Sequence, residues 1–220
     1  MTRHEMRLSR RRALLGVGAA AALTAATPWR RAGAAVAANA APAAPIEQLD
    51  AALLSAMKAD SGTPFAERYR ALAPVVEQVF SLDAVLARSV GPSWAALPPA
   101  QKATLASAFR RYTVSSYLAN FDSYNGQSFQ VLPEVRTIGD GQVVVQSRLS
   151  RASGSPIALD YVMSRGPEGW RAVDVLTNGT ISRVAVQRSD FRALLNSGGV
   201  PALTASLEHK VASLSGGMLT

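Results

Sequence analysis

Side chains that could carry out acid–base or metal chemistry are scarce in this sequence. It holds two histidines, His4 and His209, and no cysteine. Zinc sites need several such residues together, and a hydrolytic triad needs a histidine beside a carboxylate. The sequence also lacks the G-x-x-x-x-G-K-[ST] phosphate loop and the G-x-G-x-x-G dinucleotide motif. We therefore predict no metal, no cofactor and no catalytic residue, and a protein that is not an enzyme.

Asp174 is the carboxylate that comes closest to a candidate general base. It shares a period-two strand face with Trp170, so we expect it to be partly buried. A buried carboxylate needs a partner, and Arg183 and Arg188 are the natural candidates. We predict a structural ion pair between Asp174 and Arg188. The alternative is an isomerase or dehydratase in which Asp174 or Tyr161 acts as the acid or base.

Apolar and aromatic side chains are concentrated on one long helix and on the strands that follow it. The helix is expected from Pro98-Pro99, since proline suits the first turn, to about Asn125-Gly126. On the strand expected at 156–165, Asp160 alternates with the apolar side chains and should face water. Periodicity leaves open whether the apolar residues fill a core or line a cavity. As pocket-lining residues we predict Phe109, Tyr112, Tyr117, Phe121, Val143, Val145, Leu159, Tyr161, Met163, Trp170, Val184 and Phe191.

The order of elements indicates the fold class. Helical periodicity predicts helices over 46–60, 65–80 with a kink or restart near Pro74, and 81–90, and again after Gly179 with a break at Gly198-Gly199. Period-two alternation predicts strands over 127–138, 142–151, 156–165 and 169–176. The loops between these strands are short, and one contains Asp140-Gly141, a strong hairpin signal. We predict an α+β fold in which the N- and C-terminal helices pack on one face of a four-stranded antiparallel sheet.

The first 40 residues have the zones of an export signal. Arg10-Arg11-Arg12 lies in a basic start, residues 13–27 are weakly apolar, and Ala38-Asn39-Ala40 is an A-x-A type cleavage site. Residues 9–14 resemble the twin-arginine consensus S-R-R-x-F-L, with Ala13 where phenylalanine is usual. About 15 apolar residues are fewer than the roughly 20 that span a bilayer. We expect a twin-arginine signal peptide over 1–40, cleaved near Ala40, and a periplasmic mature protein.

Removing this leader changes the charge of the chain. The full sequence has a formal net charge of +8, but residues 1–40 hold seven arginines and one acid, which leaves 16 basic and 14 acidic residues. Nucleic-acid-binding domains carry a basic patch or stripe, so we predict no nucleic-acid partner. We divide the mature chain into a flexible lead-in at 41–45, one domain at 46–214 and a tail at 215–220.

A series of motifs in this domain resembles the MlaC family of periplasmic lipid-binding proteins. A W-x-x-x-D-V strand leads into G-x-S and an R-x-x-F helix, at Trp170, Asp174, Val175, Gly179, Ser182, Arg188 and Phe191. Upstream, the resemblance rests on Phe80, Leu82-Asp83, Gly91-Pro92-Ser93-Trp94, Leu97, Gln101, Phe109-Arg110-Arg111-Tyr112, Tyr117 and Phe121-Asp122-Ser123-Tyr124. The sequence departs from the family at Phe80-Ser81, where Phe-Asp is usual. Its details look closest to the hopanoid-biosynthesis-associated HpnM branch.

The resemblance implies an NTF2-like curved sheet whose helices enclose an apolar pocket for acyl chains. It also implies a soluble carrier of phospholipid or hopanoid between the two membranes. The partners it implies are an inner-membrane MCE-type ABC transporter complex and an outer-membrane lipoprotein complex. We expect a monomer that contacts these membrane complexes transiently.

Overall fold

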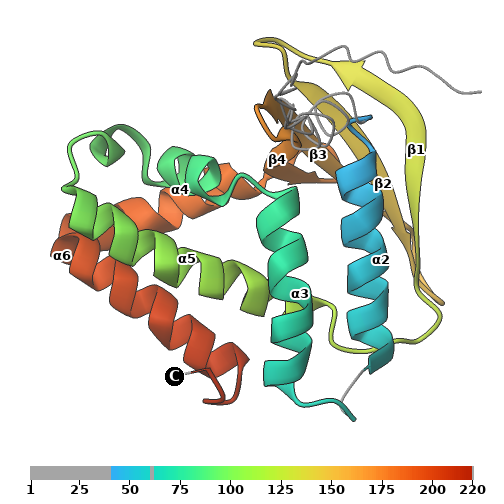
Figure 1. Ribbon diagram of the computed structural model, residues 1–220, viewed down its shortest axis with the longest axis horizontal. Coiled ribbons are helices and arrows are strands. Elements are labelled where there is room, and N and C mark those ends of the chain that lie inside the picture. Colours follow the sequence, from blue (N-terminus) through green and yellow to red (C-terminus); the bar gives the residue numbers. More distant parts are fainter. Residues whose placement is uncertain (1–40, 60–61, 220) are drawn as a thin grey trace, which may run out of the picture.

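The computed structural model describes residues 41–59 and 62–219 (Figure 1). The expected leader, its cleavage point near Ala40 and the final residue of the expected tail lie outside the described residues. The helices are α2 (Ala44–Ala59), α3 (Phe65–Val79), α4 (Leu82–Val90), the 3₁₀ helix η1 (Gly91–Trp94), α5 (Pro99–Asn120) and α6 (Arg183–Leu214). The strands are β1 (Ser128–Thr137), β2 (Val143–Ser150), β3 (Ile157–Gly166), β4 (Gly169–Thr177) and β5 (Ile181–Ser182). None of the helices in the described ranges has the length and apolar character needed to cross a membrane.

The strands form one antiparallel sheet in the order β1-β2-β3-β4-β5. The α+β class and the antiparallel meander are confirmed, but the sheet has five strands instead of four. The additional strand is only two residues long, and Ile181 and Ser182 pair with Thr177 and Leu176 of β4. Two residues are too few to produce a period-two signal, so the sequence pattern could not have revealed β5.

The helices lie together on one side of the sheet, as Figure 1 shows. α2 and α3 stand side by side against the strands, while α5 packs along α6 farther from the sheet. α3 does not restart at Pro74, whereas α6 is interrupted at Gly198-Gly199, as predicted. Gly199 has φ +65°, a left-handed conformation that glycine adopts without strain.

α5 ends at Asn120, five residues earlier than the sequence predicts. Phe121 leaves the helical conformation at φ −127° and ψ 56°. Its ring stacks on Tyr117 at 6.2 Å and lies 5.8 Å from the ring of Phe129 on β1. The helix thus ends where Phe121 contacts β1, although the local sequence favours a longer helix.

A carboxyl group is buried where α2 meets the sheet. Asp50 is 5% exposed, and its Oδ2 accepts a hydrogen bond from Ser147 Oγ on β2 at 2.7 Å. Its Oδ1 has no hydrogen-bond partner within the described part of the chain. Loss of hydration raises the pKa of Asp50 from 3.8 to about 6, although the Ser147 bond opposes the shift.

We expect Asp50 to make the protein less stable as pH rises from 4 to 7. The unfolded chain releases this proton near pH 4 and the folded chain near pH 6, so the unfolded state binds fewer protons between these values. The shift corresponds to about 3 kcal/mol of unfolding free energy. Asp50→Asn should remove this part of the pH dependence in urea titrations at pH 4.5 and 7.5. Equal pH slopes for wild type and variant would contradict the assignment.

Candidate functional site

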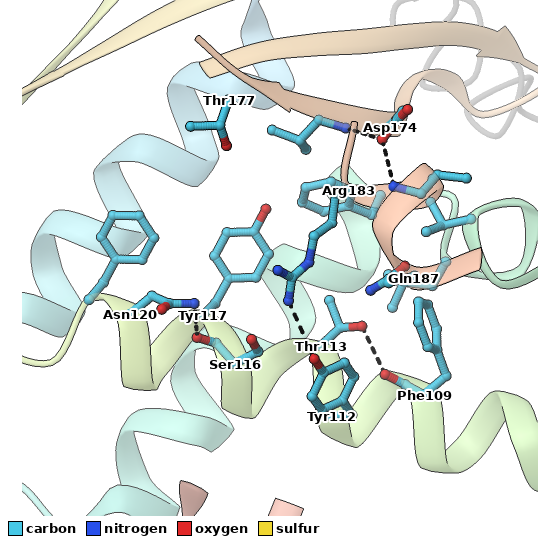
Figure 2. Close-up of a pocket in the computed structure, with 16 residues that line it drawn as sticks. Phe109, Tyr112, Thr113, Ser116, Tyr117, Asn120, Asp174, Thr177, Arg183 and Gln187 are labelled. Atoms are coloured by element: carbon cyan, nitrogen blue, oxygen red, sulfur yellow. Dashed lines mark hydrogen bonds between the residues drawn. The ribbon is translucent and has the colours of Figure 1, made fainter. Parts of the chain in front are cut away.

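A pocket lies between α5, the start of α6, the first turns of α4 and the end of β4 (Figure 2). Its volume is about 170 Å³. Most of its wall is aromatic or aliphatic, with polar groups contributed chiefly by α5, β4 and α6. The lining residues are Phe80, Leu82, Val85, Phe109, Tyr112, Thr113, Ser116, Tyr117, Asn120, Phe121, Asp174, Val175, Thr177, Arg183, Val184 and Gln187.

α5 supplies the pocket with two parallel stripes of side chains. The aromatic stripe consists of Phe109, Thr113 and Tyr117 on α5 and of Phe121 directly after its last residue, spaced by four residues. The polar stripe runs beside it and consists of Tyr112, Ser116 and Asn120, again spaced by four. The aromatic stripe continues beyond the helix, because Phe80 lies 5.7 Å from the ring of Tyr117. The pocket therefore has an apolar side and a polar side along a single helix.

Five of the twelve predicted pocket residues line this pocket: Phe109, Tyr112, Tyr117, Phe121 and Val184. The other seven do not lie on its wall. Four are buried in the hydrophobic core, and three are partly buried against it. The four core residues are Val145, Tyr161, Met163 and Phe191, and the three partly buried residues are Val143, Leu159 and Trp170.

Several lining residues were absent from the prediction. Thr113, Ser116 and Asn120 are polar, but each lies three or four residues from a predicted aromatic residue, so helical spacing could have identified them. Phe80, Leu82 and Val85 come from the junction of α3 and α4. No periodic signal links that junction to α5.

Asp174 lines the pocket, but its carboxylate is occupied by other groups. Its Oδ1 accepts hydrogen bonds from the backbone N–H groups of Val175 at 2.8 Å and Val184 at 3.1 Å. Its Oδ2 accepts from Ser182 Oγ at 2.5 Å. Ser182 Oγ in turn accepts from the N–H of Ala185 at 3.0 Å and caps α6. The hydrogen bonds of Asp174 thus connect β4 to the first residues of α6 and to the residue that caps it.

The predicted ion pair between Asp174 and Arg188 is wrong. Arg188 instead donates from Nε and Nη2 to the carbonyl oxygen of Arg88 in the last turn of α4, at 2.8 and 2.6 Å. The register explains the error: Val162 pairs with Asp174 but Met163 pairs with Ala172, which leaves one extra residue in β4. Such a β-bulge interrupts the alternation of side chains, so Asp174 does not share a face with Trp170.

Asp160 was expected to face water, and this expectation is also wrong. It is 5% exposed, accepts a hydrogen bond from Gln146 Nε2 at 2.7 Å and lies 3.8 Å from Arg136 Nη2. Gln146 lies on β2, which pairs with β3, and Arg136 lies on β1, one strand farther along the sheet. The negative charge of Asp160 is thus balanced by partners on the sheet, and its side chain does not line the pocket.

The arrangement gives little support to acid–base chemistry. Asp174, the one carboxylate among the described lining residues, accepts three hydrogen bonds. Tyr161 is 1% exposed, and burial raises the pKa of its phenol well above 10.0, so it stays protonated. No cluster of His, Cys, Asp or Glu within residues 41–59 and 62–219 could hold a metal ion. The pocket is suited to bind an apolar group with a polar end.

Comparison with known proteins identifies the family. The family model described as MlaC protein matches residues 47–209, nearly three quarters of the chain. The chain belongs to the MlaC family. The domain shares its fold with the phospholipid-binding protein from Ralstonia solanacearum, whose structure was solved in complex with a phospholipid. The TM-score is 0.69 at 21% identity, and the match covers 80% of this chain and 99% of the other.

Proposed function

We propose that this MlaC protein is a lipid carrier that holds phospholipid acyl chains in the pocket between α5 and β4. The observation that carries the proposal is the aromatic stripe of α5, which faces a cavity in a member of this family. The fold shared with a phospholipid-bound protein also supports it. On this proposal the chain is not an enzyme.

The physical need for such a pocket follows from the chemistry of acyl chains. Each buried CH₂ is favoured by about 0.8 kcal/mol over one in water. Moving an acyl chain of about 16 carbons from an apolar environment into water would therefore cost roughly 13 kcal/mol of free energy. A soluble carrier lowers this barrier by offering an apolar surface outside the membrane.

The pocket must widen to take two such chains. Its volume of about 170 Å³ is close to that of a cavity that holds benzene, roughly 150 Å³. It is below the range of about 300–1,000 Å³ that is usual for drug-sized ligands. We infer that loading moves α5 and the start of α6 away from β4.

The setting of the carrier is part of the proposal. On this proposal the twin-arginine signal peptide over 1–40 is cleaved near Ala40, and the exported domain at 46–214 acts in the periplasm as a monomer. There it would exchange lipid with an inner-membrane MCE-type ABC transporter complex and an outer-membrane lipoprotein complex. The resemblance to the HpnM branch keeps a hopanoid as the alternative ligand.

Mass spectrometry of lipid extracted from the exported, purified protein tests the proposal. We expect about one phospholipid per protein, and a protein that purifies without lipid and takes none from vesicles would contradict it. Asp174→Asn addresses the enzyme alternative, in which Asp174 is the general base. A variant that still carries lipid supports the carrier. Lipid that is chemically converted by wild type and only carried by the variant favours the enzyme.

A further inference from the structure

Arg183 extends across the mouth of the pocket. It is the first residue of α6, its side chain is exposed, and its Nη2 donates to the hydroxyl of Tyr112 on α5 at 3.3 Å (Figure 2). Among the described lining residues it is the one that carries a positive charge. Its charge also reaches into the pocket, because it opposes the burial-driven rise in the pKa of Tyr117.

Within residues 41–59 and 62–219, no carboxylate forms an ion pair with this arginine. The nearby Asp174 directs its oxygens to Ser182 and to two backbone N–H groups, and no ion pair between described residues includes Arg183. Lys210 adds a second cation, with its Nζ 5.5 Å from the ring centroid of Tyr112. It too has no carboxylate within 4.0 Å among the described residues. Tyr112, on the polar side of the pocket, therefore contacts two cations.

We propose that Arg183 binds the phosphate of the ligand's headgroup, and so makes the carrier selective for lipids that bear a phosphate. This inference rests on the proposed function. A guanidinium has five N–H donors, and one of them contacts Tyr112. The others can form the paired, charge-assisted hydrogen bonds that arginine makes with phosphate oxygens. The acyl chains then follow the aromatic stripe of α5 inward.

The polar stripe of α5 supports this orientation. Ser116 and Asn120 follow Tyr112 at intervals of four residues along the pocket, so they lie on the side where the glycerol and ester groups would pass. A neutral lipid with the same chains would leave the charge of Arg183 without a partner. A hopanoid without a phosphate would do the same, so the inference favours phospholipid over hopanoid.

Lipid uptake from vesicles of phosphatidylcholine tests the inference. One set contains labelled phosphatidylglycerol and the other labelled diacylglycerol with identical chains. We expect wild type to take up at least about tenfold more phosphatidylglycerol, which corresponds to about 1.4 kcal/mol. Arg183→Ala should take up the two lipids equally, with diacylglycerol uptake unchanged, and Arg183→Lys should keep part of the preference. Arg192→Ala, at an exposed position of α6, is the matched control and should behave as wild type.

The possible failures are distinguishable. If wild type takes up neither labelled lipid, the proposed function fails. If wild type and Arg183→Ala both take up the two lipids equally, the carrier stands and the inference is overturned.

Inorganic phosphate distinguishes a headgroup site from a site for the free ion. The headgroup site predicts that millimolar phosphate leaves the melting temperature and the lipid preference of wild type unchanged. The inference would be overturned if phosphate raised the melting temperature of wild type but not of Arg183→Ala, and no lipid preference was found.

Discussion

Ser116→Trp is expected to reduce lipid loading strongly while leaving the fold intact. Ser116 lies in the middle of the polar stripe of α5, and its half-buried side chain lines the pocket. An indole placed there occupies most of a cavity of about 170 Å³, because a cavity of about 150 Å³ holds a single benzene ring. Since the pocket is open on one side, the ring can settle without displacing core side chains. We expect at least a tenfold loss of bound lipid, about 1.4 kcal/mol.

Lipid counted by mass spectrometry, together with the thermal unfolding temperature, checks this result. Ser107→Trp is the matched control, because Ser107 is exposed on the same helix and does not line the pocket. It should carry lipid as wild type does. If the Ser116→Trp protein is folded and still carries lipid, the acyl chains bind somewhere other than this pocket. The alternative binding region would then be the predicted residues of β2 and β3, which lie in the hydrophobic core or against it.

Most of the fold could be predicted because its elements carry strong periodic signals. The break at Gly198-Gly199 and the hairpin at Asp140-Gly141 depend on residues that adopt positive φ, and local sequence reveals these directly. The sequence predicted too long a helix for α5, whose end coincides with the packing of the Phe121 ring against Phe129 on β1. That contact joins two elements, and periodicity within one segment carries no information about it.

The site was harder to predict than the fold. The aromatic residues of α5 were identified by their apolar character, but Ser116 and Asn120 have the pattern of an ordinary solvated helix face. Asp174 was assigned the wrong partner because one extra residue in β4 shifts every later side chain to the opposite face. Arg183 was considered only as a partner for a buried acid. Its position at the pocket mouth depends on how α6 begins beside β4.

Phe109→Ala is expected to give the largest loss of stability. Phe109 is 1% exposed and Phe191 is 2% exposed, and their rings meet edge to face at 6.2 Å, which joins α5 to α6. Truncating a buried phenylalanine costs about 3–5 kcal/mol, since transfer free energy is lost and a cavity remains. For a domain of this size the melting temperature should fall by roughly 6–20 °C. Urea unfolding of the delipidated protein measures the effect.

The same variant should keep its lipid, which makes it the converse of Ser116→Trp. Phe109 is the buried first member of the aromatic stripe and also lines the pocket, so its loss enlarges the space available to acyl chains. Phe121→Ala, at the half-buried last member of the stripe, should cost less stability because its ring leaves a smaller buried cavity. A folded Phe109→Ala protein without lipid would mean that the chains need contact with this ring, which the added space does not replace. A stability loss below about 1 kcal/mol would mean that the contact between Phe109 and Phe191 does not hold α5 on α6.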